Sequence, residues 1–77
     1  MPALAFRARL LVRYAGAGED LWHERVVLGH LGGARYLVIT PDSDVYEEDY
    51  APNNPDIEAV RIETRNEVPA DLANQEL

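Results

Sequence analysis

The sequence contains no cysteine and no lysine, and it has only one tryptophan and one phenylalanine among its 77 residues. The absence of cysteine excludes disulfide bonds and thiolate metal sites. No stretch approaches the ~20 apolar residues of a membrane-spanning helix. Arg7, Arg9 and Arg13 interrupt the N-terminal segment before it reaches the length of a signal-peptide core. We therefore predict an intracellular protein, cytoplasmic or nuclear, that does not enter a membrane.

Positive charge is scarce and unevenly distributed. Seven arginines stand against 14 aspartates and glutamates, which gives a net charge of −7. Residues 1–41 hold five of the arginines and three of the acids, whereas residues 42–77 hold two arginines and eleven acids. Because nucleic-acid binding depends on cations that neutralise phosphates, this balance disfavours a nucleic-acid partner. The acidic second half either favours a basic partner or serves solubility alone.

Alternation of apolar and polar residues at period two predicts a strand over residues 4–14, with Phe6, Leu10 and Val12 facing the core and arginines facing solvent. Further strands are predicted over residues 21–30, 34–40, 45–50 and 57–64. The connections are too short for the ~10–12-residue crossovers that parallel strands need. The strands should therefore form an antiparallel sheet.

Glycine and proline mark the turns between these strands. Gly32-Gly33 is typical of a tight hairpin, and Pro41-Asp42-Ser43-Asp44 of a turn in which aspartate side chains bond nearby amides. Around Val26-Val27-Leu28 apolar residues occur on both faces, as in a strand buried on both sides or crossing between sheets. Pro69 predicts one short helical turn in the C-terminal tail.

Five short strands in fewer than 70 residues predict an all-β fold, a small five-stranded antiparallel barrel. The order of a long strand, a loop, a hairpin, a short acidic strand and a last strand resembles the SH3-like barrels, which include SH3, Tudor and chromo-barrel modules. Tyr14, a loop of small residues and then Glu19-Asp20-Leu21 are similar to the start of signalling SH3 domains. Other five-stranded small barrels, such as the OB type, remain open at this point.

The resemblance is one of pattern. The tryptophan pair and the late proline-asparagine-tyrosine signature of signalling SH3 domains are absent, because Trp22 stands alone and Asn54 follows Pro52-Asn53. The resemblance spans residues 4–64 and implies an SH3-like barrel over those residues. The whole chain, residues 1–77, is then one domain with a tail at 65–77.

The aromatic residues near the loops suggest a binding groove. Trp22, Tyr46 and Tyr50 offer large contact areas at low entropic cost. Acidic residues flank them in the stretch Asp42, Asp44, Glu47, Glu48 and Asp49. Such a groove would bind a basic or proline-containing segment. Alternatively, the aromatics fill the core and rim of the barrel, and the acids form a charged edge strand.

Catalytic, metal and cofactor sites are not predicted. The acidic stretch fails the calcium-loop template, which needs glycine at its sixth position and glutamate at its twelfth, where this chain has Glu47 and Asn53. His23 and His30 lie about 23 Å apart on an extended strand, too far to share a metal. No hydroxyl or carboxylate stands in a recognisable catalytic setting. We expect no enzyme activity and no cofactor.

Two functions are favoured over a third, nucleic-acid binding through the shared face of Arg7, Arg9 and Arg13, which the net charge of −7 disfavours. The first is a non-catalytic interaction module that binds a basic or proline-containing peptide through the aromatic and acidic residues named above. The second is a structural or assembly domain, an oligomerisation unit or spacer in a larger polyprotein or complex, in which the domain packs on a second copy.

Overall fold

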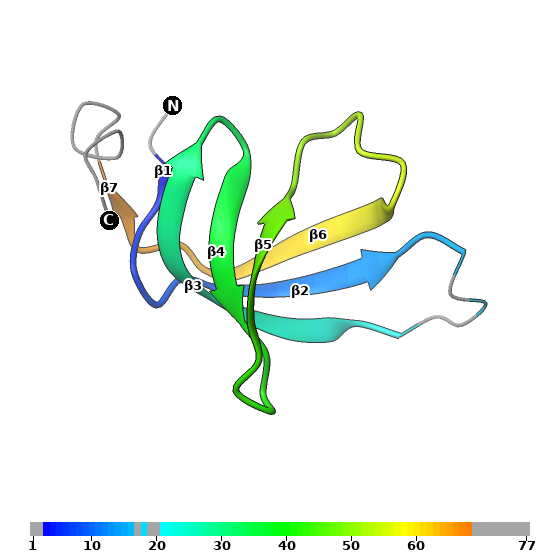
Figure 1. Cartoon of the computed structure of the whole chain (residues 1–77), viewed down its shortest axis with the longest axis horizontal. Helices are drawn as coiled ribbons and strands as arrows, with labels where there is room; N and C mark the ends of the chain where they lie inside the picture. Colours follow the sequence, from blue (N-terminus) through cyan, green and yellow to red (C-terminus); the bar gives the residue numbers. More distant parts are fainter. Residues whose placement is uncertain (1–2, 17, 19–20, 69–77) are drawn as a thin grey trace.

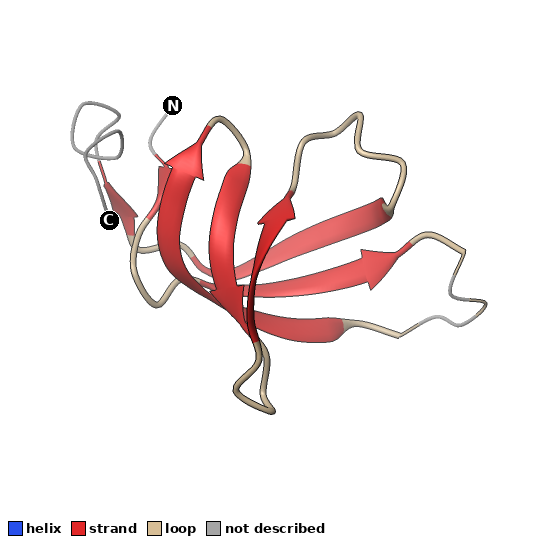
Figure 2. Ribbon diagram, in the orientation of Figure 1, coloured by secondary structure: helices blue, strands red, loops and turns tan. Residues whose placement is uncertain are grey.

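The computed structural model describes residues 3–16, 18 and 21–68. In this part of the chain every regular element is a strand, so it offers no helix that could cross a membrane (Figure 2). The strands are β1 (Ala3–Leu4), β2 (Arg9–Tyr14), β3 (His23–Gly32), β4 (Arg35–Ile39), β5 (Val45–Asp49), β6 (Ile57–Thr64) and β7 (Glu67–Val68). The predicted all-β fold is confirmed. The helical turn predicted at Pro69 lies outside the described residues.

The main sheet is antiparallel and has the strand order β5-β4-β3-β2-β6, while β1 and β7 pair separately. Strands β2 to β5 follow one another as a meander, and β6 returns to pair with the free side of β2 (Figure 1). The predicted five-stranded antiparallel sheet is thus confirmed. Because β5 and β6 remain its two edges, the described strands do not close into a barrel.

Strand β3 bends the sheet. Its pairing with β4 shifts register between Val27 and Gly29 and again between His30 and Gly32, and such bulges bend a strand and increase its twist. As a result β4 and β5 run across the direction of β2 and β6 (Figure 1). Leu28 is the additional residue at the first shift, which accounts for the loss of clean alternation there.

The core lies on one side of this bent sheet. Its fully buried large side chains are Leu10 and Val12 from β2, Val27 from β3 and Val38 from β4. All four lie on the face that period-two alternation assigns to the interior. These four side chains come from three neighbouring strands. Their packing against one another therefore depends on the register of β2, β3 and β4.

The first predicted strand is interrupted, and Phe6 is not a core residue. Arg7 adopts a φ of 73° in the left-handed region, and the amide of Ala8 donates to the carbonyl of Ala5 at 3.0 Å. This turn separates β1 from β2. The Phe6 side chain is 60% exposed, with the Arg7 guanidinium 5.2 Å from its ring centre. Alternation cannot reveal such a turn, because Phe6 and Ala8 are both apolar.

The glycine pair predicted to form the hairpin does so. Gly32 and Gly33 have φ values of 108° and 56°, a region that residues with a Cβ rarely enter. They join β3 to β4, and the pairing of these two strands begins next to the turn with Gly32 opposite Arg35. The hairpin therefore places the start of β4 beside the end of β3 without a longer loop.

Candidate functional site

Three tyrosines meet on the core-facing side of the sheet. Tyr14 ends β2, Tyr46 lies in β5 and Tyr50 directly follows β5. Their rings are half-buried and pack against the rim of the core. Together with Glu48 of β5 and Arg25 of β3 they form what we call the tyrosine cluster.

Strand register explains why these residues meet. Tyr14 shares its face of β2 with the buried Val12. Tyr46 pairs with the buried Val38, and Arg25 pairs with the buried Leu10. Each therefore points to the same side as the core.

The polar atoms of the cluster form one hydrogen-bonded chain. The Tyr14 hydroxyl lies 2.8 Å from both carboxylate oxygens of Glu48, and the Tyr50 hydroxyl lies 2.8 Å from Oε1. The Tyr46 hydroxyl is 2.9 Å from the Tyr14 hydroxyl and 3.3 Å from Glu48. A carboxylate only accepts and each hydroxyl has one proton. Tyr14 and Tyr50 therefore donate to Glu48, and Tyr46 donates to the nearer Tyr14.

Arg25 completes this chain at its other end. Its Nε donates to the Tyr46 hydroxyl at 2.6 Å, and Nη1 donates to the backbone carbonyl of Glu24 at 2.6 Å. Its guanidinium carbon lies 5.7 Å from the ring centres of both Tyr14 and Tyr46, within range of a cation–π interaction. The hydrogen-bonded chain of side chains thus has a cation, Arg25, at one end and a carboxylate, Glu48, at the other.

The cluster holds Tyr14 and Tyr50 in the neutral form. Burial raises the pKa of Tyr14 well above its ordinary value, and hydrogen bonds to Tyr46 and Glu48 raise it further. Burial also raises the pKa of Tyr50, together with the hydrogen bond to Glu48 and the charge of that carboxylate. For Arg25, burial lowers the pKa, but hydrogen bonding to Tyr46 and the nearby tyrosines outweigh it and raise the pKa overall.

We expect the domain to lose stability at alkaline pH because of these shifts. Tyrosines of the unfolded chain ionise near pH 10, whereas Tyr14 and Tyr50 stay protonated in the fold. Above about pH 10 the unfolded state therefore binds fewer protons, and the free energy of unfolding falls as pH rises. Urea midpoints from about pH 8 to about pH 11.5 measure this, and a Tyr14→Phe, Tyr50→Phe variant should decline less steeply. Equal slopes in the two proteins would contradict it.

A second row of rings joins the cluster to the core. The buried Tyr36 ring lies 6.1 Å from the Tyr50 ring and 4.9 Å from the His30 ring, measured between centres. The Tyr36 hydroxyl accepts a hydrogen bond from the backbone amide of Leu4 at 3.4 Å. Tyr50 therefore contacts the core on one side and Glu48 on the other, which fixes the position of its ring.

Of the five acids predicted to flank the groove, only Glu48 joins the tyrosines. Glu47 points to the opposite side of β5 and forms an ion pair with Arg35. The Asp49 carboxylate accepts a hydrogen bond from the backbone amide of Ala51 at 2.8 Å. Asp42 and Asp44 lie in the exposed turn between β4 and β5.

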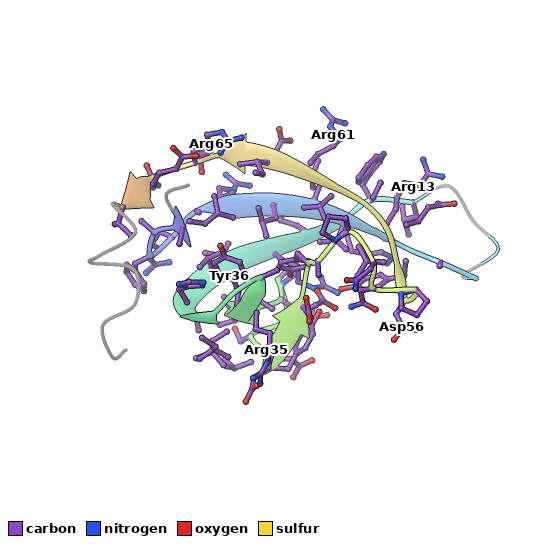
Figure 3. All side chains as sticks on the ribbon, turned by 90° about the horizontal axis from the view of Figure 1, so that it is seen from above. Arg13, Arg35, Tyr36, Asp56, Arg61 and Arg65 are labelled. Carbon is purple, nitrogen blue, oxygen red and sulfur yellow. The ribbon has the colours of Figure 1, made fainter. Side chains whose placement is uncertain are left out.

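Trp22 lies on the other side of the sheet, away from Tyr46 and Tyr50. Its ring centre is 5.4 Å from the guanidinium carbons of both Arg13 and Arg61. Arg13 precedes Tyr14 in β2 and so points to the opposite face. In Figure 3 both arginines project from the outer surface of β2 and β6, away from β4 and β5. The predicted contact set of Trp22, Tyr46 and Tyr50 is therefore not brought together in this structure.

The two histidine rings lie in tilted contact with tyrosine rings. The His23 ring lies 5.5 Å from the Tyr14 ring, and the His30 Nε2 lies 2.8 Å from the carbonyl of Gly33. Among residues 3–16, 18 and 21–68, no group of three or more histidines and acids is placed to hold a metal ion. His23 thus contacts the tyrosine cluster, and His30 contacts the hairpin.

Comparisons with family models, with curated proteins and with solved structures gave no match. What the tyrosine cluster can bind therefore follows from its own geometry.

The sequence interpretation omitted two residues of the cluster, Tyr14 and Arg25. Tyr14 belongs to the same period-two series as Leu10 and Val12, so its core-facing position was visible in the alternation. Arg25 alternates with Val27 in the same way, and an inward-pointing arginine requires hydrogen-bond partners. That requirement was the one sequence feature that could have indicated a polar cluster beside the core.

Proposed function

We propose that this domain is a non-catalytic interaction module that binds a basic or proline-containing peptide segment against the tyrosine cluster. The observation that carries the proposal is the convergence of three half-buried tyrosine rings on one carboxylate, with a cation lying over two of the rings. Tyrosine rings give large contact areas at low entropic cost, and partner segments use them repeatedly. The cluster itself therefore has the composition of a cation- and proline-binding surface.

Electrostatics support a basic partner. The net charge of −7 attracts basic segments at long range. Asp42, Asp44 and Glu47 add exposed carboxylates near β5, the strand that supplies Tyr46 and Glu48. These acids would increase the association rate more than the affinity, while the tyrosines would make the short-range contacts.

The strand order supports the finer part of the proposal, an SH3-like arrangement. The meander from β2 to β5, followed by β6 beside β2, has the succession of strands on which the sequence resemblance rests, with a hairpin, a short acidic strand and a last strand. In this proposal the module is an open version of such a barrel, with the tyrosine cluster at the open rim.

An amide-shift titration tests the function. With a panel of arginine- and proline-containing peptides, we expect localised shifts at Tyr14 and residues 46–50. Tyr46→Ala should weaken binding at least about tenfold, provided that its amide spectrum stays dispersed. Trp22→Ala is the matched aromatic control and should bind as the wild type does, because Trp22 lies on the other side of the sheet. Shifts centred on Trp22, or no shifts in the folded domain, would contradict the proposal.

An assembly role is the second candidate, and exposed apolar residues favour it. Phe6, Val45 and Leu21 are 60%, 52% and 49% exposed, and both edge strands keep an unpaired side within the described sheet. Packing on a second copy would cover such surface. Sedimentation of the domain over a wide concentration range distinguishes the two functions: a strict monomer at all concentrations excludes self-assembly.

A further inference from the structure

Arg25 is held in the cluster by aromatic rings rather than by a carboxylate. Its guanidinium carbon lies 5.7 Å from the ring centres of Tyr14 and Tyr46. Within the described part of the chain it forms no ion pair, whereas Arg9, Arg35 and Arg65 each do. The side chain is also only partly buried. Its position is thus that of a cation resting on two tyrosines at the rim of the core.

The contacts of Arg25 are those that an arginine from another chain could make. Nε donates to a tyrosine hydroxyl at 2.6 Å and Nη1 donates to a backbone carbonyl at 2.6 Å. A planar guanidinium presents five donors and stacks on aromatic faces, whereas a lysine ammonium is compact and strongly hydrated. The position therefore suits arginine better than lysine.

We propose that Arg25 occupies the place that an arginine of the partner segment takes on binding, so that Arg25 is a built-in competitor and the module selects arginine-containing segments. This inference rests on the proposed function and narrows it: the basic partner residue is an arginine, and its binding requires Arg25 to leave the two rings. Leaving is feasible because no carboxylate within ion-pair distance in the described structure holds the guanidinium in place.

Arg25→Ala empties the position and gives the main test. An arginine-containing peptide should bind this variant about tenfold more tightly than it binds the wild type, equivalent to about 1.4 kcal/mol. The matched control is Arg35→Ala, which removes the same charge from an exposed arginine paired with Glu47. The control should bind as the wild type does, so that a general charge effect is separated from the emptied position. A peptide with lysine in place of arginine should gain clearly less from Arg25→Ala.

A measurement on the wild type keeps the inference testable if Arg25→Ala does not fold. The Nε–H resonance of Arg25 reports its hydrogen bond to Tyr46. Saturation with the arginine peptide should move this resonance to the position of a solvent-exposed arginine, while the Nε–H of Arg35 should stay in place.

The outcomes separate this inference from the function on which it rests. Peptide binding at the cluster with no gain in Arg25→Ala, or with an unmoved Arg25 resonance, overturns the competitor role and leaves the interaction module standing. Absence of binding in the wild type, in Arg35→Ala and in Arg25→Ala overturns both. A gain of equal size in Arg35→Ala and Arg25→Ala would show that net charge alone is responsible, which also overturns the inference.

Discussion

Replacing Leu10 by alanine is expected to lower the free energy of unfolding by about 3 kcal/mol. Leu10 is fully buried in β2, an interior strand that pairs with both β3 and β6. Its truncation removes apolar area from the core and leaves a cavity. The surrounding strands hold the cavity open, because their backbones are fixed by hydrogen bonds on both sides of β2.

The expected loss in Leu10→Ala is large relative to the free energy of unfolding of the whole domain. A chain of this length has a free energy of unfolding of about 4–12 kcal/mol, and only four large side chains in the described part of the chain are fully buried. Losing one of them should leave a measurable unfolded fraction at moderate temperature. Urea unfolding followed by far-ultraviolet circular dichroism gives the difference, as a shift in midpoint at an unchanged slope.

Leu21→Ala is the control for this prediction. It makes the same chemical change at a side chain that is 49% exposed and outside the strands, so it should cost less than about 1 kcal/mol. Similar losses at Leu10 and Leu21 would show that the core described here is not what stabilises the fold.

Glu48→Gln is expected to cost about 2 kcal/mol, because it replaces the carboxylate on which three tyrosine hydroxyls converge. An amide has one acceptor oxygen, and its nitrogen would face the Tyr14 hydroxyl in place of Oε2. The loss of negative charge should also lower the pKa values of Tyr14 and Tyr50 toward the ordinary range, since that charge raises both. Burial remains, so the return should be partial.

Glu47→Gln provides a control in the neighbouring residue. Glu47 lies on the other side of β5, and its exposed ion pair with Arg35 should contribute less than about 1 kcal/mol. Urea midpoints at neutral pH give the two stability changes, and absorbance near 295 nm during an alkaline titration gives the tyrosine pKa values. If Glu47→Gln destabilised the domain as much as Glu48→Gln, or if the tyrosine titration did not change in Glu48→Gln, the role assigned to the cluster would be wrong.

Much of the architecture was predictable because the deciding information is local. Alternation over residues 57–64 located β6 with its observed bounds, and the glycine pair at 32–33 located the hairpin. The acidic stretch 45–50 was predicted to be an edge strand, and β5 is one. One exception was the turn at Phe6, where left-handed backbone at a non-glycine residue left no trace in the pattern. Another was the predicted barrel, because β5 and β6 remain the edges of the described sheet.

The candidate site was predictable only in part. Tyr46, Tyr50 and Glu48 were assigned together to the predicted groove because they lie within five residues of one another, and in the structure both hydroxyls lie within 3.3 Å of the Glu48 carboxylate. Trp22 was grouped with them on composition alone, and in the structure its ring lies near the guanidinium groups of Arg13 and Arg61 on the opposite side of the sheet.

By itself, the sequence determined the strand content, the antiparallel order of short strands, the tight hairpin and the surplus of negative charge, since each follows from neighbouring residues or from composition. Tertiary structure alone decided that Tyr14 of β2 meets Glu48 of β5 and that Arg25 of β3 meets Tyr46 of β5. The physical reason is that these contacts join residues 21 to 34 positions apart. They depend on the register and bend of β3 and β4, which place side chains from β2, β3 and β5 at a common rim of the core.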